Sequence, residues 1–138
     1  MSIVVVRGGM QSTIQDLGRY GYQKYGIVVS GAMDKDALRL GNMLVGNRHD
    51  EAALEITMLG PVLQFTEDAL IAVTGGDLQP QLDGKPMPMG RPVAIEAGTT
   101  LRFGKPVSGC RAYLCVSGGF DVPFVMGSKS TYLRAALG

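Results

Sequence analysis

Short apolar or alternating runs recur along most of the chain, and glycine, proline or aspartate separates them. The runs are rich in Val, Ile, Leu, Phe and Tyr, a composition typical of strands. Strands of about five residues that recur every ten or so, without helices between them, favour a β-sandwich or barrel. The predicted strands are residues 3–6, 54–58, 62–65, 70–74, 78–82, 93–97, 100–103 and 111–116.

One helix interrupts the strands, in MDKDALRLGNMLVGN (residues 33–47). Asp34 can cap the first turn, and a Gly-Asn pair at 46 and 47 suits a left-handed end. We expect Gly41 to allow close approach to a strand, because a mid-helix glycine otherwise costs about 1 kcal/mol. A shorter helix or 3₁₀ turn is predicted at residues 130–137. Spacing of three, four and seven residues predicts an apolar face made of Ala37, Leu40, Gly41 and Leu44.

Two segments resemble each other: LIAVTGGDL (residues 70–78) and YLCVSGGFD (residues 113–121). Each runs an apolar strand into a hydroxyl residue, two glycines and a nearby aspartate. Paired glycines free the backbone to present N–H groups to an anion. They are also common turn makers. Neither segment has the spacing of a phosphate-binding motif, so we favour ordinary tight turns.

Length and composition favour one globular domain of 138 residues, since 46% of the residues are hydrophobic and 18% are charged. The net charge of +1 argues against a nucleic-acid or membrane-surface partner. No run approaches the roughly 18 apolar residues of a membrane helix, and the N-terminal apolar run is too short for a secretory signal. We therefore expect a cytoplasmic protein.

The cysteines and the histidine give no metal site. Cys110 and Cys115 are five residues apart on a predicted strand, so their side chains should lie on opposite faces and cannot pair or share a metal ion. We expect two buried thiols. The lone His49 is expected to be a solvated loop residue.

Residues 12–34, STIQDLGRYGYQKYGIVVSGAMD, contain many polar side chains that do not follow the alternation of a strand. An arginine fork suits a carboxylate or phosphate, and a neighbouring aspartate can hold it in place. A long functional loop is one interpretation. A structural salt bridge between Asp16 and Arg19, with tyrosines covering a barrel end, is the other. The polar residues concerned are Gln15, Asp16, Arg19, Gln23, Lys24, Ser30 and Asp34.

Long strings of this chain resemble one family. They are GMQSTIQDLGRYGYQKYGIVVSGAMDKDALRLGNMLVGN, EAALEITMLGPVLQF, VTGGD and GCRAYLCVSGGFDVPFVMGSKSTYLRAALG. In this order they resemble the biotin-dependent carboxyltransferase-like family. That family includes the C subunit of bacterial 5-oxoprolinase, the KipI antagonist KipA, allophanate hydrolase subunit 2 and part of the carboxyltransferase domain of urea carboxylase.

The resemblance implies a mainly β, cyclophilin-like barrel with one or two short helices. Family chains are about twice as long, so it also implies that residues 1–138 are a single domain equivalent to the N-terminal half of such a chain, apparently truncated. A barrel that later strands close in the family could expose an edge here, and exposed edges invite pairing. Self-association through that edge is therefore predicted.

The resemblance also implies function. The first hypothesis is the C subunit of an ATP-dependent 5-oxoprolinase that works with a KipI-like B subunit and a lactam-opening A subunit. Asp16 and Arg19 are expected to be catalytic, and Gln15, Arg19, Ser30, Lys129 and Ser130 to bind substrate. The candidate cationic clamps are Arg19, Lys24 and Arg134. The candidate groups that orient a metal or take a proton are Asp16, Asp34, Glu55 and Asp77. Asp34 can equally be only the helix cap, and Glu55 can project to solvent.

Two alternatives stay open. A non-enzymatic antagonist would bind a KipI-like inhibitor and so relieve a sensor kinase. A carboxyltransferase would act on urea or a related amide. The expected cofactor of the first hypothesis is ATP with Mg, bound by the complex. Biotin would serve only carboxyl transfer and would arrive on another protein, because Met87-Pro88-Met89 lacks the lysine of a biotinylation site.

Overall fold

Two antiparallel sheets and one helix make up the part of the chain that the computed structural model describes, residues 2–7, 11–15, 34–120 and 132–134. The six-stranded sheet has the order β11-β1-β4-β9-β6-β7, and the five-stranded sheet has the order β2-β3-β10-β5-β8. The mainly β prediction is confirmed. The six-stranded sheet consists of β1 (Ser2–Arg7), β4 (Val62–Phe65), β6 (Gln81–Leu82), β7 (Lys85–Pro86), β9 (Thr100–Arg102) and β11 (Tyr132–Arg134). The five-stranded sheet consists of β2 (Gln11–Gln15), β3 (Ala53–Thr57), β5 (Ala69–Asp77), β8 (Val93–Ile95) and β10 (Ser108–Val116).

The main core lies between the two sheets and draws on both of them. Successive side chains of a strand point to opposite faces, so each central strand divides its residues between two layers. On β5, Ile71 and Val73 face this core, whereas Ala72 faces away from it. The five-stranded sheet is therefore covered on both faces. Residues of the core that are fully buried include Ile3, Leu54, Ile56, Leu63, Phe65, Leu78, Leu101 and Leu114.

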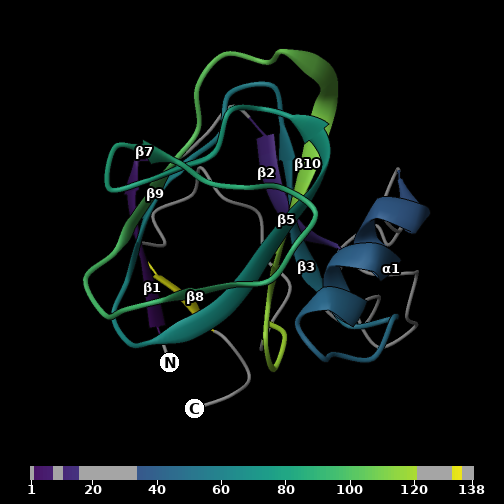
Figure 1. Cartoon of the computed structure of the whole chain (residues 1–138), viewed down its shortest axis with the longest axis horizontal. Helices are drawn as coiled ribbons and strands as arrows, with labels where there is room; N and C mark the ends of the chain where they lie inside the picture. Colours follow the sequence, from purple (N-terminus) through teal and green to yellow (C-terminus); the bar gives the residue numbers. More distant parts are fainter. Residues whose placement is uncertain (1, 8–10, 16–33, 121–131, 135–138) are drawn as a thin grey trace.

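Helix α1 (Lys35–Leu44) packs on the outer face of the five-stranded sheet, away from the six-stranded sheet (Figure 1). A second apolar cluster fills this layer with residues of α1, β3, β5 and β10. Gly41 is the point of closest approach, because a Cβ there would lie 2.5 Å from the Cys115 Sγ. The predicted reason for this mid-helix glycine is thereby confirmed.

The buried face of α1 differs from the predicted one. Leu40 is 47% exposed, whereas Leu38 and Asn42 are fully buried beside Ala37 and Gly41. Close packing at Gly41 turns the helix so that Leu40 lies at the border of the contact. The predicted ends are right, since Asp34 caps the helix and Gly46 has a φ of +78° just after it.

Three strands were not predicted, and one predicted helix is wrong. β2, β7 and β11 lie outside the apolar runs, and β11 occupies residues for which a helix or 3₁₀ turn was expected. β11 and β2 form strands because they pair with strands that are distant in sequence. Leu133 of β11 lies opposite Ile3 of β1, and Ile14 of β2 lies opposite Leu54 of β3. The predicted strand 78–82 is reduced to β6, because Gln79 has a φ of +51° and interrupts the extended backbone before Pro80.

The paired glycines take two different forms. Gly118 and Gly119 follow β10 in a turn, as expected. Gly75 and Gly76 instead lie inside β5, so the turn prediction is wrong there. A Cβ on Gly76 would lie 2.8 Å from the Ser108 carbonyl oxygen, so these glycines allow β5 and β10 to approach at an irregularity of their register.

The two cysteines are free, as predicted, with Cys115 buried and Cys110 exposed. The expectation that both thiols are buried is wrong for Cys110, which lies on the outer end of β10 next to the register irregularity. His49 is exposed, as expected for a loop histidine.

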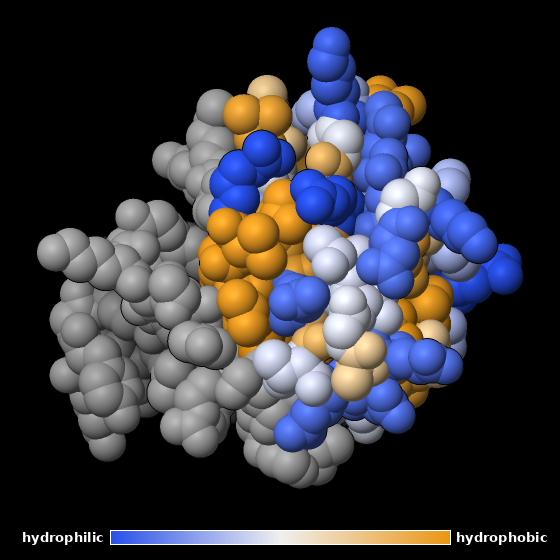
Figure 2. Space-filling view, turned by 90° about the vertical axis from the view of Figure 1, so that its left-hand side faces the viewer, coloured by the Kyte–Doolittle hydropathy of each residue, from blue (hydrophilic) through white to orange (hydrophobic). Residues whose placement is uncertain are grey.

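The surface on the side of the six-stranded sheet is mostly polar where it is described, with an apolar area near the centre of the view (Figure 2). Within the described residues, no helix is long and apolar enough to span a membrane. The outermost strands there are β2 and β8 in one sheet and β11 and β7 in the other. Self-association through an edge stays a prediction.

Candidate functional site

The candidate residues from the sequence fall into two groups. Gln15 is the last residue of β2 and pairs with Ala53, whereas Arg134 is the last residue of β11 and pairs with Ser2 in the other sheet. Asp34, Glu55 and Asp77 lie in the described parts of the five-stranded sheet and of α1. The remaining candidates lie outside the described residues: Asp16, Arg19, Gln23, Lys24, Ser30, Lys129 and Ser130.

A row of polar residues runs across the outer face of the five-stranded sheet, under the start of α1. Tyr113 on β10 lies opposite Glu55 on β3 and opposite Thr74 on β5. All three side chains are buried, with exposed fractions of 0%, 7% and 2% respectively. Their register makes them direct cross-strand neighbours on one face. The row therefore presents hydrogen-bonding groups to the helix inside an otherwise apolar layer.

Tyr113 joins the sheet to the residue that begins the helix. Its hydroxyl donates to Glu55 Oε2 over 2.6 Å and accepts from the Asp34 backbone N–H over 2.9 Å. On the neighbouring strand β5, the Thr74 hydroxyl donates to the Ala37 carbonyl oxygen over 2.7 Å. Asp34 and Glu55, two of the predicted candidates, are thus linked through Tyr113. The prediction that Glu55 projects to solvent is wrong, because its side chain is only 7% exposed and accepts from the buried Tyr113 hydroxyl.

Burial, and then the hydrogen bond to Glu55, raise the pKa of Tyr113 well above its usual value. Removing a proton from this phenol would place a second negative charge beside a buried carboxylate, which is unfavourable. The phenol therefore stays protonated at neutral pH and keeps its proton directed at Glu55. Sequence reasoning missed Tyr113, because an aromatic residue in an apolar strand is typical of core packing.

The other end of α1 is held by a separate network. The Asn47 amide donates to the Val116 carbonyl oxygen over 2.8 Å and accepts from the Gly118 N–H over 2.7 Å. Asn42 Nδ2 donates to the Glu51 carbonyl oxygen over 2.7 Å. The Gly118 N–H is therefore already satisfied within the protein, so these glycines do not form an open anion-binding nest.

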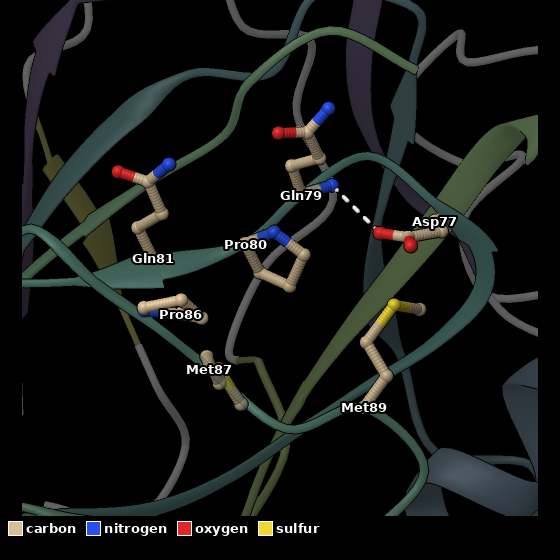
Figure 3. Close-up of a pocket in the computed structure, with 7 residues that line it drawn as sticks. All are labelled: Asp77, Gln79, Pro80, Gln81, Pro86, Met87 and Met89. Atoms are coloured by element: carbon tan, nitrogen blue, oxygen red, sulfur yellow. Dashed lines mark hydrogen bonds between the residues drawn. The ribbon is translucent and has the colours of Figure 1, made fainter. Parts of the chain in front are cut away.

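A shallow pocket of about 340 Å³ lies elsewhere, where β5 ends and β6 and β7 form a hairpin (Figure 3). The Asp77 carboxylate accepts from the Gln79 backbone N–H over 2.9 Å, and the Met89 thioether points into the space beside Pro80. The lining contains no basic side chain, so it offers no partner to an anion. The lining residues are Asp77, Gln79, Pro80, Gln81, Pro86, Met87 and Met89.

Metal-ligating side chains do not gather in the described ranges: no group of three or more His, Cys, Asp or Glu side chains there could hold an ion. Asp34 uses one carboxylate oxygen to cap Ala37, Glu55 accepts from Tyr113, and Asp77 binds Gln79. A metal role for these three carboxylates is therefore not supported by the geometry. In the described structure these carboxylates accept hydrogen bonds from two backbone N–H groups and from one side-chain hydroxyl.

Comparison with known proteins gives close relatives of two kinds. Urea amidolyase of Saccharomyces cerevisiae is 43% identical over 138 residues, which are 99% of this chain and 8% of that protein. The C subunit of the Escherichia coli 5-oxoprolinase is 42% identical over 134 residues, which are 97% of this chain and 43% of that protein. The chain thus spans less than half the length of each of these relatives.

A solved structure agrees with these similarities. The crystal structure of the Kluyveromyces lactis urea carboxylase has a TM-score of 0.79 and 41% identity, and the match covers 94% of this chain and 12% of that one. A family model described as carboxyltransferase domain, subdomain A and B, matches residues 25–138. On this match, over most of its length, the chain belongs to the carboxyltransferase domain family, subdomains A and B.

Proposed function

We propose that the chain is part of the C subunit of an ATP-dependent 5-oxoprolinase, which opens 5-oxoproline to L-glutamate. The observation that carries the proposal is the 42% identity to the corresponding Escherichia coli protein over 97% of this chain. The corresponding Haemophilus influenzae protein adds 44% identity over 93% of the chain. In the proposal the chain acts with a KipI-like B subunit and a lactam-opening A subunit.

The proposed reaction needs cationic side chains near the substrate atoms on which negative charge accumulates. 5-Oxoproline carries a carboxylate, and phosphoryl activation of its lactam carbonyl adds further negative charge. The proposal assigns the anion clamp to Arg19, with Asp16 holding the Arg19 guanidinium in place, and gives Lys24 and Arg134 supporting charge. Gln15, Ser30, Lys129 and Ser130 complete the substrate contacts. The pocket at Asp77 lacks a basic lining and has no part in the proposed site.

ATP and its Mg²⁺ belong to the complex in this proposal. The described residues offer no cluster of metal-ligating side chains. The whole sequence, in addition, lacks a GxxxxGK[ST] phosphate-binding motif. Nucleotide binding is assigned to the complex as a whole, and no step is assigned to a nucleotide held by the described part of this chain.

Carboxyl transfer to urea or a related amide is a second candidate. Its support is the 43% identity to the yeast urea amidolyase and the description of the matching family as a carboxyltransferase domain. Met87-Pro88-Met89 lacks a biotinylated lysine, so carboxybiotin would be supplied from outside these 138 residues. Avidin would then block the reaction, whereas it would leave lactam opening untouched.

The test compares both reactions in one reconstituted system. The protein is mixed with ATP and its lactam-opening and KipI-like partners, and phosphate release is measured with 5-oxoproline and with no substrate. A parallel mixture contains urea, bicarbonate and a biotin-carrying carboxylase as the carboxyl donor. The proposal predicts release that depends on 5-oxoproline, requires this protein and resists avidin. Avidin-sensitive carboxylation of urea would support the second candidate instead. A stable complex with the KipI-like partner that turns over neither substrate would favour a regulatory antagonist.

A further inference from the structure

The pocket beside Asp77 is built from backbone that is fixed at several points (Figure 3). Gln79 has a φ of +51°, which residues other than glycine rarely adopt, and Asp77 holds this turn by accepting from the Gln79 N–H. The rings of Pro80 and Pro86 restrict φ, and the Met87 N–H donates to the Pro80 carbonyl oxygen over 2.9 Å. The pocket is therefore preformed, because its walls do not need a ligand to order them.

The pocket has an apolar floor and one charged side chain. Met87 is only 5% exposed and belongs to the main core, Pro80 is buried, and Met89 packs against the same core. Asp77 is partly buried at the end of β5, and its carboxylate and the Met89 thioether lie beside Pro80 in Figure 3. The other six residues that line the pocket are uncharged. Such a lining suits a ligand with an apolar body and a positively charged end.

The Asp77 carboxylate has hydrogen-bonding capacity left. A carboxylate offers about four acceptor positions, and one of them, on Oδ1, takes the Gln79 N–H. No lysine or arginine of the described residues pairs with Asp77. Lys85 precedes Pro86 in the chain, and the Lys105 carbonyl oxygen accepts from Gln79, but neither lysine lines the pocket. Within the described part of the chain, the second oxygen of Asp77 is therefore free to accept from a donor.

Two other aspartates show that the turn itself does not need this charge. Asp68 and Asp83 also accept from a backbone N–H, over 2.8 and 2.9 Å. Both are exposed and lie outside the pocket lining, whereas Asp77 is partly buried beside apolar side chains. Holding the turn requires only an acceptor oxygen, which an asparagine would also supply. The negative charge of Asp77 is thus available to a cation.

We infer that this pocket binds an ammonium group on an aliphatic stem, carried either by a free alkylamine or by a lysine side chain of another protein. The ammonium donates to the free oxygen of Asp77, and the stem lies against Pro80 and the Met89 thioether, since such apolar surface suits methylene groups. A single free oxygen fits an ammonium better than a guanidinium, whose fork needs both oxygens of a carboxylate. The inference does not depend on the proposed function.

n-Butylammonium is the probe, and 1-butanol is the neutral control with the same number of heavy atoms. Binding is followed on the intact protein through the NMR signals of the methionine methyl groups. We expect saturable shifts at Met89 and none at Met43, which is 67% exposed on α1. 1-Butanol should bind about fivefold more weakly, as expected for the loss of one partly exposed ion pair. The affinity for n-butylammonium should fall when salt is added.

Asp77→Asn is the direct variant, because it removes the charge and keeps an acceptor for the Gln79 N–H. It should weaken the binding of n-butylammonium about fivefold and leave that of 1-butanol unchanged. Asp83→Asn is the matched control, since Asp83 also accepts from a backbone N–H but lies outside the lining, and it should bind both probes like the wild type. The comparison of the two probes on the wild-type protein needs no variant, so it decides even if Asp77→Asn folds poorly.

Equal affinities of the wild type for n-butylammonium and 1-butanol would overturn the inference, and so would a wild-type affinity in Asp77→Asn or equal shifts at Met43 and Met89. The source of the ammonium is identified in the complex with the partner proteins of the proposed function. Binding of n-butylammonium to that complex supports a free amine as the ligand. Exclusion of the probe, together with a complex that Asp77→Asn weakens and Asp83→Asn does not, supports a lysine of a partner.

Discussion

Gly41 shows at the scale of a residue how closely the helix and the sheet are fitted. A Cβ at this position would lie 2.5 Å from the Cys115 Sγ and 3.1 Å from the Thr74 Oγ1. An alanine would gain about 1 kcal/mol of helix propensity, but overpacking of a buried contact costs about 1–3 kcal/mol. The two terms oppose each other, and the steric term is the larger.

We therefore expect Gly41→Ala to lower the free energy of unfolding by up to about 2 kcal/mol. Chemical denaturation of the wild type and the variant measures this change. Cys115→Ala removes the clashing sulfur, so in that background Gly41→Ala should cost less or become stabilising. An equal cost in both backgrounds would show that the contact with Cys115 is not the cause.

Arg19 is the residue on which the proposed anion clamp depends. Arg19→Ala should abolish 5-oxoproline-dependent turnover of the complex and leave the melting temperature nearly unchanged, because in the proposal the guanidinium binds substrate and does not hold the fold together. Arg39→Ala is the control, since Arg39 pairs with Asp36 on the exposed face of α1. It should change neither quantity. A large drop in melting temperature for Arg19→Ala would favour the structural salt bridge over the clamp.

At the scale of an element, α1 is held at both ends by side chains that do not belong to a regular pattern. Asn47 follows the helix and binds both the Val116 carbonyl and the Gly118 N–H. Asn47→Ala would leave the Gly118 N–H without its partner, at a cost of about 1–3 kcal/mol, whereas the Val116 carbonyl oxygen would keep its hydrogen bond from the Gly119 N–H.

Asn47→Ala should lower the unfolding free energy by that amount, as measured by denaturation in urea. Asn47→Asp is the matched variant: it keeps an acceptor for the Gly118 N–H and loses the donor for the Val116 carbonyl. Its cost should lie between those of the wild type and of Asn47→Ala. A stability of Asn47→Ala equal to the wild type would contradict a role for this network.

Elements whose local signals and burial agree could be predicted from the sequence. β4 matches its predicted range, and α1 begins at the predicted cap because Asp34 binds the Ala37 N–H. β2 and β11 could not be predicted, since their residues become strands only by pairing with β3 and β1. Local patterns carry no information on such distant partners.

The candidate site was predicted less fully, for a related reason. Asp34 and Glu55 were recognised as candidates, but the group that links them is Tyr113, and the link depends on the register of β3 and β10. The role of Glu55 was misjudged because strand alternation alone does not show that both faces of β3 are buried. The remaining site residues, including Arg19, stay predictions because they lie outside the described residues.

At the scale of the whole molecule, buried acids give a defined pH dependence. Burial raises the pKa of the Cys115 thiol to about 12, whereas a thiol in an unfolded chain ionises near about 8.5. Between these values the unfolded state releases a proton that the folded state keeps. Stability from this group is therefore fully present below pH about 8.5 and declines above it, by up to about 1.4 kcal/mol per pH unit.

Urea denaturation between pH 7 and 10, at pH steps of about one unit, measures this decline. In Cys115→Ala the decline should begin only at higher pH, where Tyr113 contributes in the same direction because its pKa is also raised. Cys110→Ala is the control, since Cys110 is exposed, and it should keep the wild-type slope. The same slope in Cys115→Ala as in the wild type would contradict burial of an ionisable thiol as the cause.

The proposed place of this protein in a 5-oxoprolinase is tested most directly by ATP hydrolysis in the reconstituted complex. Phosphate release is measured with the lactam-opening and KipI-like partners and 5-oxoproline, with and without this protein. We expect stoichiometric release of phosphate and glutamate that requires all three proteins. Release at the same rate without this protein would contradict the proposal, and so would avidin-sensitive turnover of urea in place of 5-oxoproline.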